Sequence, residues 1–105
     1  MEEESPVIQA VRRKVQKWIN EGKWNSSLYL NGMDITELPE NLFANCPQLH
    51  DVYLSNNQLT NIPENLFANC PQLRAVHLEN NLFTTIPENL FANCPQLQCV
   101  SINNN

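Results

Sequence analysis

The sequence predicts an α/β solenoid, in which a short helix covers one end of a stack of repeated units that share a parallel sheet. Eleven residues, Pro-Glu-Asn-Leu-Phe-Ala-Asn-Cys-Pro-Gln-Leu, occur three times at a spacing of 24, beginning at Pro39, Pro63 and Pro87. Before Gly22 the apolar residues instead recur every three or four positions, which is the period of a helix. A fixed period of roughly 20 to 29 residues is typical of units that stack because none buries its apolar face alone.

The first expected element is a helix near the N-terminus. Ser5 and Pro6 are typical of a helix start, with serine as the N-cap and proline at the first position, and Gly22 is typical of a helix end. One apolar stripe follows from the helical period: Val7, Ile8, Val11, Val15, Trp18 and Ile19.

We expect this helix to cap the first repeat, because the end of a solenoid leaves an apolar edge that must be covered. Trp18 and Trp24 would then pack over the apolar residues of the first unit. The polar face of the helix is basic, so binding to a membrane surface or to a partner is the alternative interpretation.

Each unit then contains an expected strand and a return segment. Around Val52 and Leu54 apolar residues alternate with polar ones, which is the period of a strand with one buried face. The return segment lies between Pro63 and Pro71, two residues that suit neither the interior of a helix nor a central strand. We expect stacked strands to form a parallel sheet and the return segments to form the opposite, convex wall.

An asparagine follows each strand at the same repeat position. Asn57, Asn81 and Asn105 can each accept and donate hydrogen bonds, so we expect them to satisfy backbone groups of a tight turn. Met33 occupies this position in the first unit and cannot make these bonds. We therefore expect the first turn to be looser, or to be closed by the N-terminal cap.

The segment from Leu49 to Leu59, Leu-x-x-Val-x-Leu-x-x-Asn-x-Leu, closely resembles the leucine-rich repeat signature. The spacing of Pro63 and Phe67 is similar to that of the typical 24-residue subclass, found in extracellular receptors and many bacterial proteins. The resemblance implies a leucine-rich-repeat solenoid: a short right-handed horseshoe arc with a parallel β-sheet on its concave face. An N-terminal helical cap is also similar to the start of bacterial leucine-rich-repeat effectors.

These observations divide the chain into two parts. We expect an N-terminal amphipathic capping helix in residues 1–24 and leucine-rich repeats in residues 25–105. The expected units are 25–48, 49–72, 73–96 and a partial unit, 97–105.

The charge distribution favours a protein partner over nucleic acid. The formal net charge is −5, from 11 acidic and 6 basic residues, which gives no electrostatic attraction to phosphates. Within residues 25–105 Arg74 is the only basic residue, so a basic partner surface suits the repeats better than an acidic one. The acidic start at Met1 is unlike a secretory signal, and no apolar run is long enough to cross a membrane, so we expect no membrane contact.

Cysteine usage indicates a reducing compartment. Cys46, Cys70 and Cys94 share one apolar repeat position, where free cysteine behaves as a small buried hydrophobe. We expect a cytoplasmic protein without cofactors, while secretion without a classical signal peptide and the redox state of Cys99 stay open.

The repeats differ from one another mainly at the outward positions of the strands. The return segment is identical in three copies, so variation lies where packing does not constrain it. Drift at exposed positions is the alternative explanation. The resemblance implies recognition through the concave sheet, and we expect a non-enzymatic module that binds a protein partner through Tyr29, Asp51, Tyr53, Arg74, His77 and Glu79.

Catalysis is the contrasting hypothesis. His77 and Cys99 are the residue types of a base and a thiol nucleophile, but neighbouring strands would place them two positions out of register. The chain has two glycines, no glycine-rich phosphate loop and no His or Cys pair at zinc spacing. We expect no catalytic residues and no metal site.

The C-terminal end of the stack suggests self-association. The fourth unit is partial, so we expect its strand to be an open edge beside apolar residues of the unit before it. The residues that we expect to pair two copies in a homodimer are Phe83, Phe91, Val100 and Ile102. Self-assembly through this edge, or a role as the recognition fragment of a larger effector, is the alternative to partner binding on the concave face.

Overall fold

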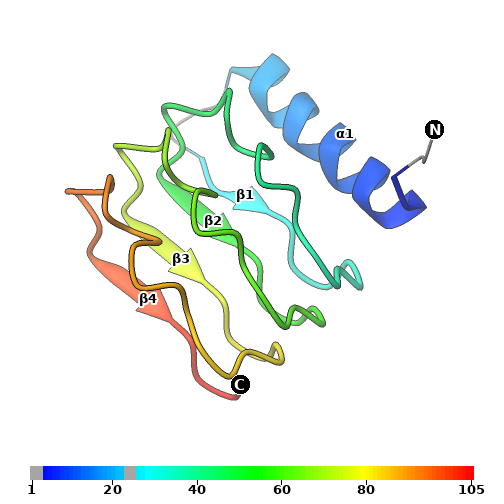
Figure 1. Cartoon of the computed structure of the whole chain (residues 1–105). Coiled ribbons are helices and arrows are strands. Elements are labelled where there is room, and N and C mark those ends of the chain that lie inside the picture. Colours follow the sequence, from blue (N-terminus) through cyan, green and yellow to red (C-terminus); the bar gives the residue numbers. More distant parts are fainter. Residues whose placement is uncertain (1–3, 23–25) are drawn as a thin grey trace.

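The structure is a computed structural model that describes residues 4–22 and 26–105, and it confirms the solenoid (Figure 1). One helix is followed by four short parallel strands, which neighbour one another in chain order in a single sheet. The register of 24 residues sets Val52 beside Leu28 and Val76, and Val76 beside Val100. The elements are α1 (Pro6–Glu21), β1 (Leu28–Tyr29), β2 (Asp51–Tyr53), β3 (Ala75–His77) and β4 (Cys99–Ser101).

Helix α1 has the predicted ends. The Ser5 side chain accepts a hydrogen bond from the Ile8 N–H at 3.2 Å, and Pro6 stands in the first turn. Gly22 has φ 67°, the left-handed backbone that favours glycine, and its N–H donates to the Ile19 carbonyl. The sequence therefore fixes both the start and the end of the helix.

Helix α1 covers the first unit, at the opposite end of the stack from β4 (Figure 1). Val11, Val15 and Trp18 are buried and belong to one apolar cluster with residues of the first unit such as Leu30 and Ile35. This confirms the capping interpretation. Trp24, also expected in the cap, lies outside the described residues.

The apolar core continues from the helix through the three full units. Phe43, Phe67 and Phe91 form a stack, with ring centroids 5.7 and 5.8 Å apart. The thiols of Cys70 and Cys94 donate weak hydrogen bonds to the carbonyls of Phe43 and Phe67 in the preceding unit, at 3.8 and 3.6 Å. Identical side chains thus pack upon one another from unit to unit.

The convex wall consists of turns instead of regular helix. In the first unit the Leu42, Ala44 and Cys46 amides each donate to a carbonyl three residues earlier, and the same bonds recur in the next two units. Since the return segments carry only turns, α1 is the only helix among the described residues.

The predicted asparagines join each turn to the unit after it. The Asn57 Oδ1 accepts hydrogen bonds from the backbone N–H groups of Met33 at 2.9 Å and Ile35 at 3.1 Å. The Asn57 Nδ2 donates back to the Leu30 carbonyl at 3.1 Å and to two carbonyls of its own turn. One buried side chain therefore satisfies backbone groups of two units.

Asn81 and Asn105 repeat this arrangement. The Leu59 N–H donates to the Asn81 Oδ1, and the Phe83 N–H donates to the Asn105 Oδ1, both at 3.1 Å. Both Nδ2 groups donate to carbonyls of the preceding unit. We call these three side chains, Asn57, Asn81 and Asn105, the asparagine ladder.

The prediction for the first turn was wrong. Met33 cannot make the bonds of an asparagine, yet this turn is neither loose nor closed by the cap, because Asn57 of the second unit satisfies it. The physical reason is that each asparagine serves the turn of the unit before its own. The first unit therefore needs no asparagine.

The same turns need a left-handed residue just before the asparagine position. Asn56, Asn80 and Asn104 have φ values of 57°, 61° and 63°, and Gly32 takes the equivalent place in the first unit with φ 65°. Asparagine and glycine tolerate this backbone better than other residues.

Replacing Asn57 with alanine should lower the free energy of unfolding by about 3 kcal/mol, because two backbone N–H groups of the first unit lose their acceptor. Urea unfolding followed by circular dichroism measures this. The matched control is Asn61→Ala: Asn61 is exposed and bonds only Thr60, so its loss should cost at most about 0.5 kcal/mol. Equal unfolding midpoints for the two variants would contradict the ladder's role.

Candidate interaction face

The outward side chains of the sheet form columns that run across the four strands, and we call this surface the concave face. Register pairs Asp51 with Ala75 and Ala75 with Cys99 in one column. The next column pairs Tyr29, Tyr53, His77 and Ser101. The residues at the ends of the strands add a third column, Asn31, Ser55, Glu79 and Asn103.

Three rings of the middle column stack on one another. The ring centroids of Tyr29 and Tyr53 are 4.8 Å apart, and those of Tyr53 and His77 are 4.1 Å apart, with the latter two rings nearly parallel at 3°. Tyr29 is 52% exposed. We call these residues the aromatic row. The structure thus places side by side the two tyrosines and the histidine that the sequence predicted as binding residues.

Acidic side chains border the aromatic row. The Ser27 hydroxyl donates to an Asp51 carboxylate oxygen at 3.5 Å, in the column next to the row. On the other side Glu79 Oε2 lies 3.9 Å from His77 Nδ1. Asp51 and Glu79 are both partly buried, so the row lies between two anchored carboxylates.

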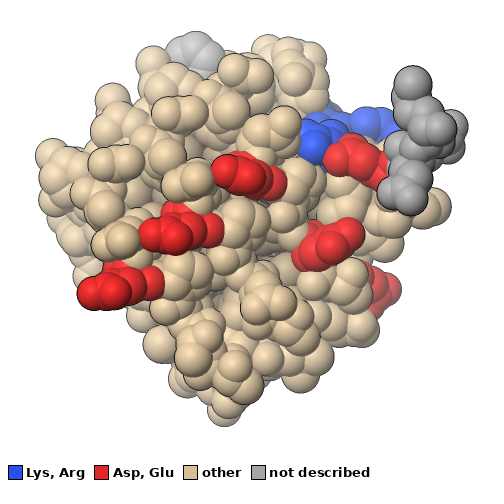
Figure 2. Space-filling view, viewed as in Figure 1, with Lys and Arg blue, Asp and Glu red and all other residues tan. Residues whose placement is uncertain are grey.

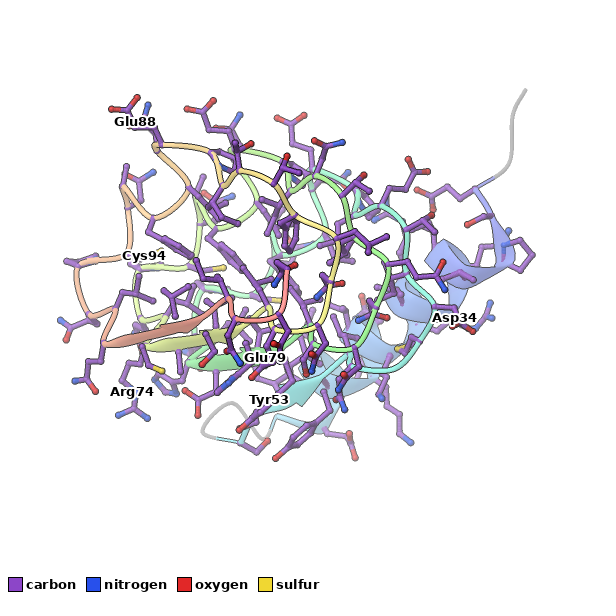
Figure 3. The ribbon with its side chains drawn as sticks, turned by 90° about the horizontal axis from the view of Figure 1, so that it is seen from below. Asp34, Tyr53, Arg74, Glu79, Glu88 and Cys94 are labelled. Atoms are coloured by element: carbon purple, nitrogen blue, oxygen red, sulfur yellow. The ribbon has the colours of Figure 1, made fainter. Side chains whose placement is uncertain are left out.

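Arg74 lies apart from the other predicted residues, immediately before β3. Its backbone joins the sheet through the His50 carbonyl, while its side chain is exposed. Figure 3 shows Arg74 and Glu79 apart, with Tyr53 nearer to Glu79 in this view. Arg74 therefore lies at the margin of the concave face.

Ser55 is an exception within the third column. It is buried, with 7% of its surface exposed, beside the left-handed turn at Asn56. The third column is therefore interrupted, and the exposed part of the concave face is centred on the aromatic row.

A hollow of about 280 Å³ adjoins the aromatic row at the α1 end. Lys14, Lys17 and Glu21 of α1 line it on one side, and Leu28 and Tyr29 of β1 line it on the other. Two basic residues of the helix, Lys14 and Lys17, thus line the same hollow as Tyr29 of the concave face.

The structure corrects part of the predicted self-association patch. Phe83 was expected to contact a second copy, but it is only 6% exposed. The fourth unit reaches Phe83, because Asn105 accepts a hydrogen bond from the Phe83 amide and β4 extends the sheet. Phe91 is partly buried against the core. The exposed large apolar side chains of this edge are Val100 and Ile102, at 37% and 47%.

A second row of polar contacts follows the return segments, and the sequence did not predict it. Figure 2 shows acidic side chains in a diagonal row along the stack, with basic side chains near the α1 end. Glu40, Glu64 and Glu88 form the only acidic position that three units share. Asn65 and Asn89 donate to the Glu40 and Glu64 carboxylates at 3.0 and 3.1 Å, so two of these glutamates bind the next unit.

Arg12 connects helix α1 to this row. Its guanidinium donates to Asn41 Oδ1 at 3.1 Å and pairs with the Glu4 carboxylate at 2.6 Å. The hydrogen bond from Arg12 lowers the pKa of Glu4 below its usual value. The helix thus contacts Asn41 as a donor, whereas the equivalent Asn65 and Asn89 themselves donate to a glutamate of the preceding unit.

The cysteines fall into two classes. Cys46, Cys70 and Cys94 are buried free thiols, and Cys99 is exposed on β4. Burial raises the pKa of Cys46 to about 11 and that of Cys70 to about 12, and it also raises the pKa of Cys94. The three buried thiols therefore stay protonated at neutral pH and serve as packing residues.

The catalytic hypothesis gains no support from the geometry. His77 pairs in register with Ser101, while Cys99 pairs with Ala75, so the thiol and the imidazole are diagonal neighbours. The Cys99 Sγ lies 4.0 Å from the Ser101 hydroxyl oxygen. Within residues 4–22 and 26–105, no cluster of three His, Cys, Asp or Glu side chains is placed to hold a metal ion. Over the same ranges, α1 is too short and too polar to span a bilayer.

Comparison with known proteins agrees with this architecture. The family model described as BspA type leucine rich repeat region, in 6 copies, matches residues 25–105. No curated protein matches the chain. Among solved structures, a chain of the Toll–Spatzle complex of Drosophila is 34% identical, with a TM-score of 0.68 over 72% of this chain. The leucine-rich repeat domain of APL1 is 32% identical over 76% of this chain, with a TM-score of 0.72.

A third structure, the leucine-rich repeat domain of APL1B, covers all of this chain at 26% identity and a TM-score of 0.75. This chain spans 10% of the Toll–Spatzle chain, 21% of the APL1 chain and 29% of the APL1B chain. The similarity is therefore to the repeat architecture, a general protein-interaction fold.

Thiol labelling at pH 8 should distinguish the two classes of cysteine. We expect one thiol of the native protein to react with a chromogenic disulfide reagent, and all four to react after unfolding, because the raised pKa values leave the buried thiols protonated. Cys99→Ser should remove the single reactive thiol. Rapid labelling of a second thiol would contradict this assignment, and a Cys99 rate far above that of a simple thiol would revive the nucleophile hypothesis.

Proposed function

This chain belongs to the BspA-type leucine-rich repeat family, and on that premise we propose that it is a non-enzymatic module that binds a protein partner through its concave face. The observation that carries the proposal is the aromatic row. Its rings lie where neither the core nor the asparagine ladder constrains the residue type. Tyrosine is a favoured anchor at protein interfaces, because it offers a large rigid area together with a polar hydroxyl group.

The rigidity of the row supports this role. Tyr53 is held between two rings, with Tyr29 at 4.8 Å and His77 at 4.1 Å, so its side chain loses little freedom when a partner binds. The flanking Asp51 and Glu79 supply acceptors for polar contacts around this apolar centre. Arg74 lies at the margin, where charges affect the rate of association more than affinity.

The compartment is part of the same proposal. An exposed thiol at Cys99, together with three buried free thiols, suits a reducing environment such as the cytoplasm. Because the chain spans at most 29% of the structures to which it is similar, a role as the recognition part of a larger effector is compatible with the same face.

Replacing Tyr29 and Tyr53 together with alanine should weaken partner binding by about 2 kcal/mol or more, the scale of interface hot spots, and leave folding intact. The partner is first captured with the wild-type chain as bait and then titrated calorimetrically. Leu82→Ala is the control, because Leu82 is 57% exposed but follows the β3 turn, away from the aromatic row. An unchanged affinity of the tyrosine variant, or an equal loss in the control, would remove this face from the proposal.

A second candidate function, self-association into a homodimer, is favoured by the exposed Val100 and Ile102 at β4. Strand β4 pairs with β3 on one side only, and an edge strand with apolar side chains can pair with another copy. A two-fold pair would close the edge without growing into a filament.

Light scattering on a size-exclusion column, over a range of concentrations, tests the homodimer. We expect Ile102→Lys to shift the protein toward monomer, because a charge would be buried at the paired edge. Thr84→Lys adds the same charge at an exposed turn and should change nothing. A wild-type chain that is monomeric at every concentration would contradict the homodimer and leave partner binding untouched.

A further inference from the structure

The aromatic row lacks a ring on its last strand. Its centroid separations of 4.8 and 4.1 Å are close to the spacing of neighbouring strands, about 4.8 Å, so each strand can contribute one ring. Tyr53 covers one face of the His77 imidazole. On β4 the residue in register with His77 is Ser101, which has no ring. No ring among the described residues stacks on the second face of the imidazole, above Ser101, and the His77 side chain is 21% exposed.

A carboxylate with an unused oxygen stands beside this position. Glu79 Oε2 lies 3.9 Å from His77 Nδ1, while Oε1 has no hydrogen-bond partner among the described residues although it is buried from water. An unpaired, partly buried carboxylate oxygen is unfavourable, and a donor from outside would relieve it. The side chain is 25% exposed, and rotation of its terminal torsion exchanges the two oxygens.

The repeats contain no lysine or arginine close enough to pair with Glu79. Arg74 is the only basic residue in residues 25–105, and it precedes β3 whereas Glu79 follows it. Five residues of extended chain separate them by about 16 Å. Figure 3 shows these two side chains apart. The position above Ser101 therefore combines a ring face on which no other ring stacks with a carboxylate that no lysine or arginine of the repeats neutralises.

We propose that the concave face binds an arginine side chain of its protein partner at this position, with the guanidinium stacked on His77 and donating to Glu79. This inference rests on the proposed function and names the chemistry of the partner. Guanidinium is planar, stacks on aromatic faces and donates several hydrogen bonds to a carboxylate at once. A lysine ammonium carries the same charge but cannot stack as a plane.

Two labelled oligopeptides of equal length, one of arginine and one of lysine, serve as probes in fluorescence anisotropy at fixed ionic strength. We expect the arginine peptide to bind about tenfold more tightly, and Glu79→Gln to remove most of that preference. Glu64→Gln is the matched control, because it removes the same charge from the return segments and should leave the preference intact. Equal affinities of the two peptides, or equal losses in both variants, would overturn the site.

Ser101→Tyr tests the position itself. A tyrosine ring on β4 should extend the aromatic row and occupy the place of the guanidinium. The arginine and lysine peptides should then bind this variant with about equal affinity, and the variant should still fold. Unchanged preference in this variant would overturn the proposal. If Tyr29 and Tyr53 govern capture of the partner while arginine and lysine bind equally, the arginine site is wrong and the proposed function stands.

Discussion

The fold depends on one constraint: each unit completes the backbone hydrogen bonds of the unit before it. Asn57 closes the turn of the first unit, and Asn81 and Asn105 close the next two. Two further contacts also run from one unit to the unit before it. Asn65 donates to the Glu40 carboxylate, and the Cys70 thiol donates to the Phe43 carbonyl. A single unit therefore leaves buried polar groups unsatisfied, so stability must arise from neighbouring pairs, as in other one-dimensional arrays.

This constraint determines which residues are free for recognition. Inward strand residues pack in the core, the residues after the strands make turns, and the identical return segments carry contacts between units. The outward strand positions have no such task, and they are where the units differ. The aromatic row uses this freedom, yet it keeps the 24-residue register, so the scaffold sets the spacing of its rings. Helix α1 closes the other end by supplying Trp18 to the core and Arg12 to Asn41.

The helical period and the capping residues Ser5 and Gly22 were sufficient to predict the helix. The repeat period was sufficient to predict the strands and their register. It was not sufficient where the partner of a residue lies in another unit. The turn at Met33 was misjudged because its acceptor, Asn57, is 24 residues away. Phe83 was misjudged because a partial unit suffices to bury it. The contact of Arg12 with Asn41 depends on how the helix docks, which periodicity does not specify.

We propose that the aromatic row is the contact surface for a protein partner. Cross-saturation nuclear magnetic resonance on the complex tests it most directly, because saturation passes only to protons at the interface. We expect the largest signal losses at the rings of Tyr29, Tyr53 and His77, with little effect at Leu82 or in the return segments. Losses concentrated at the return segments, or at Val100 of β4 and the adjacent Ile102, with the rings unaffected, would contradict it.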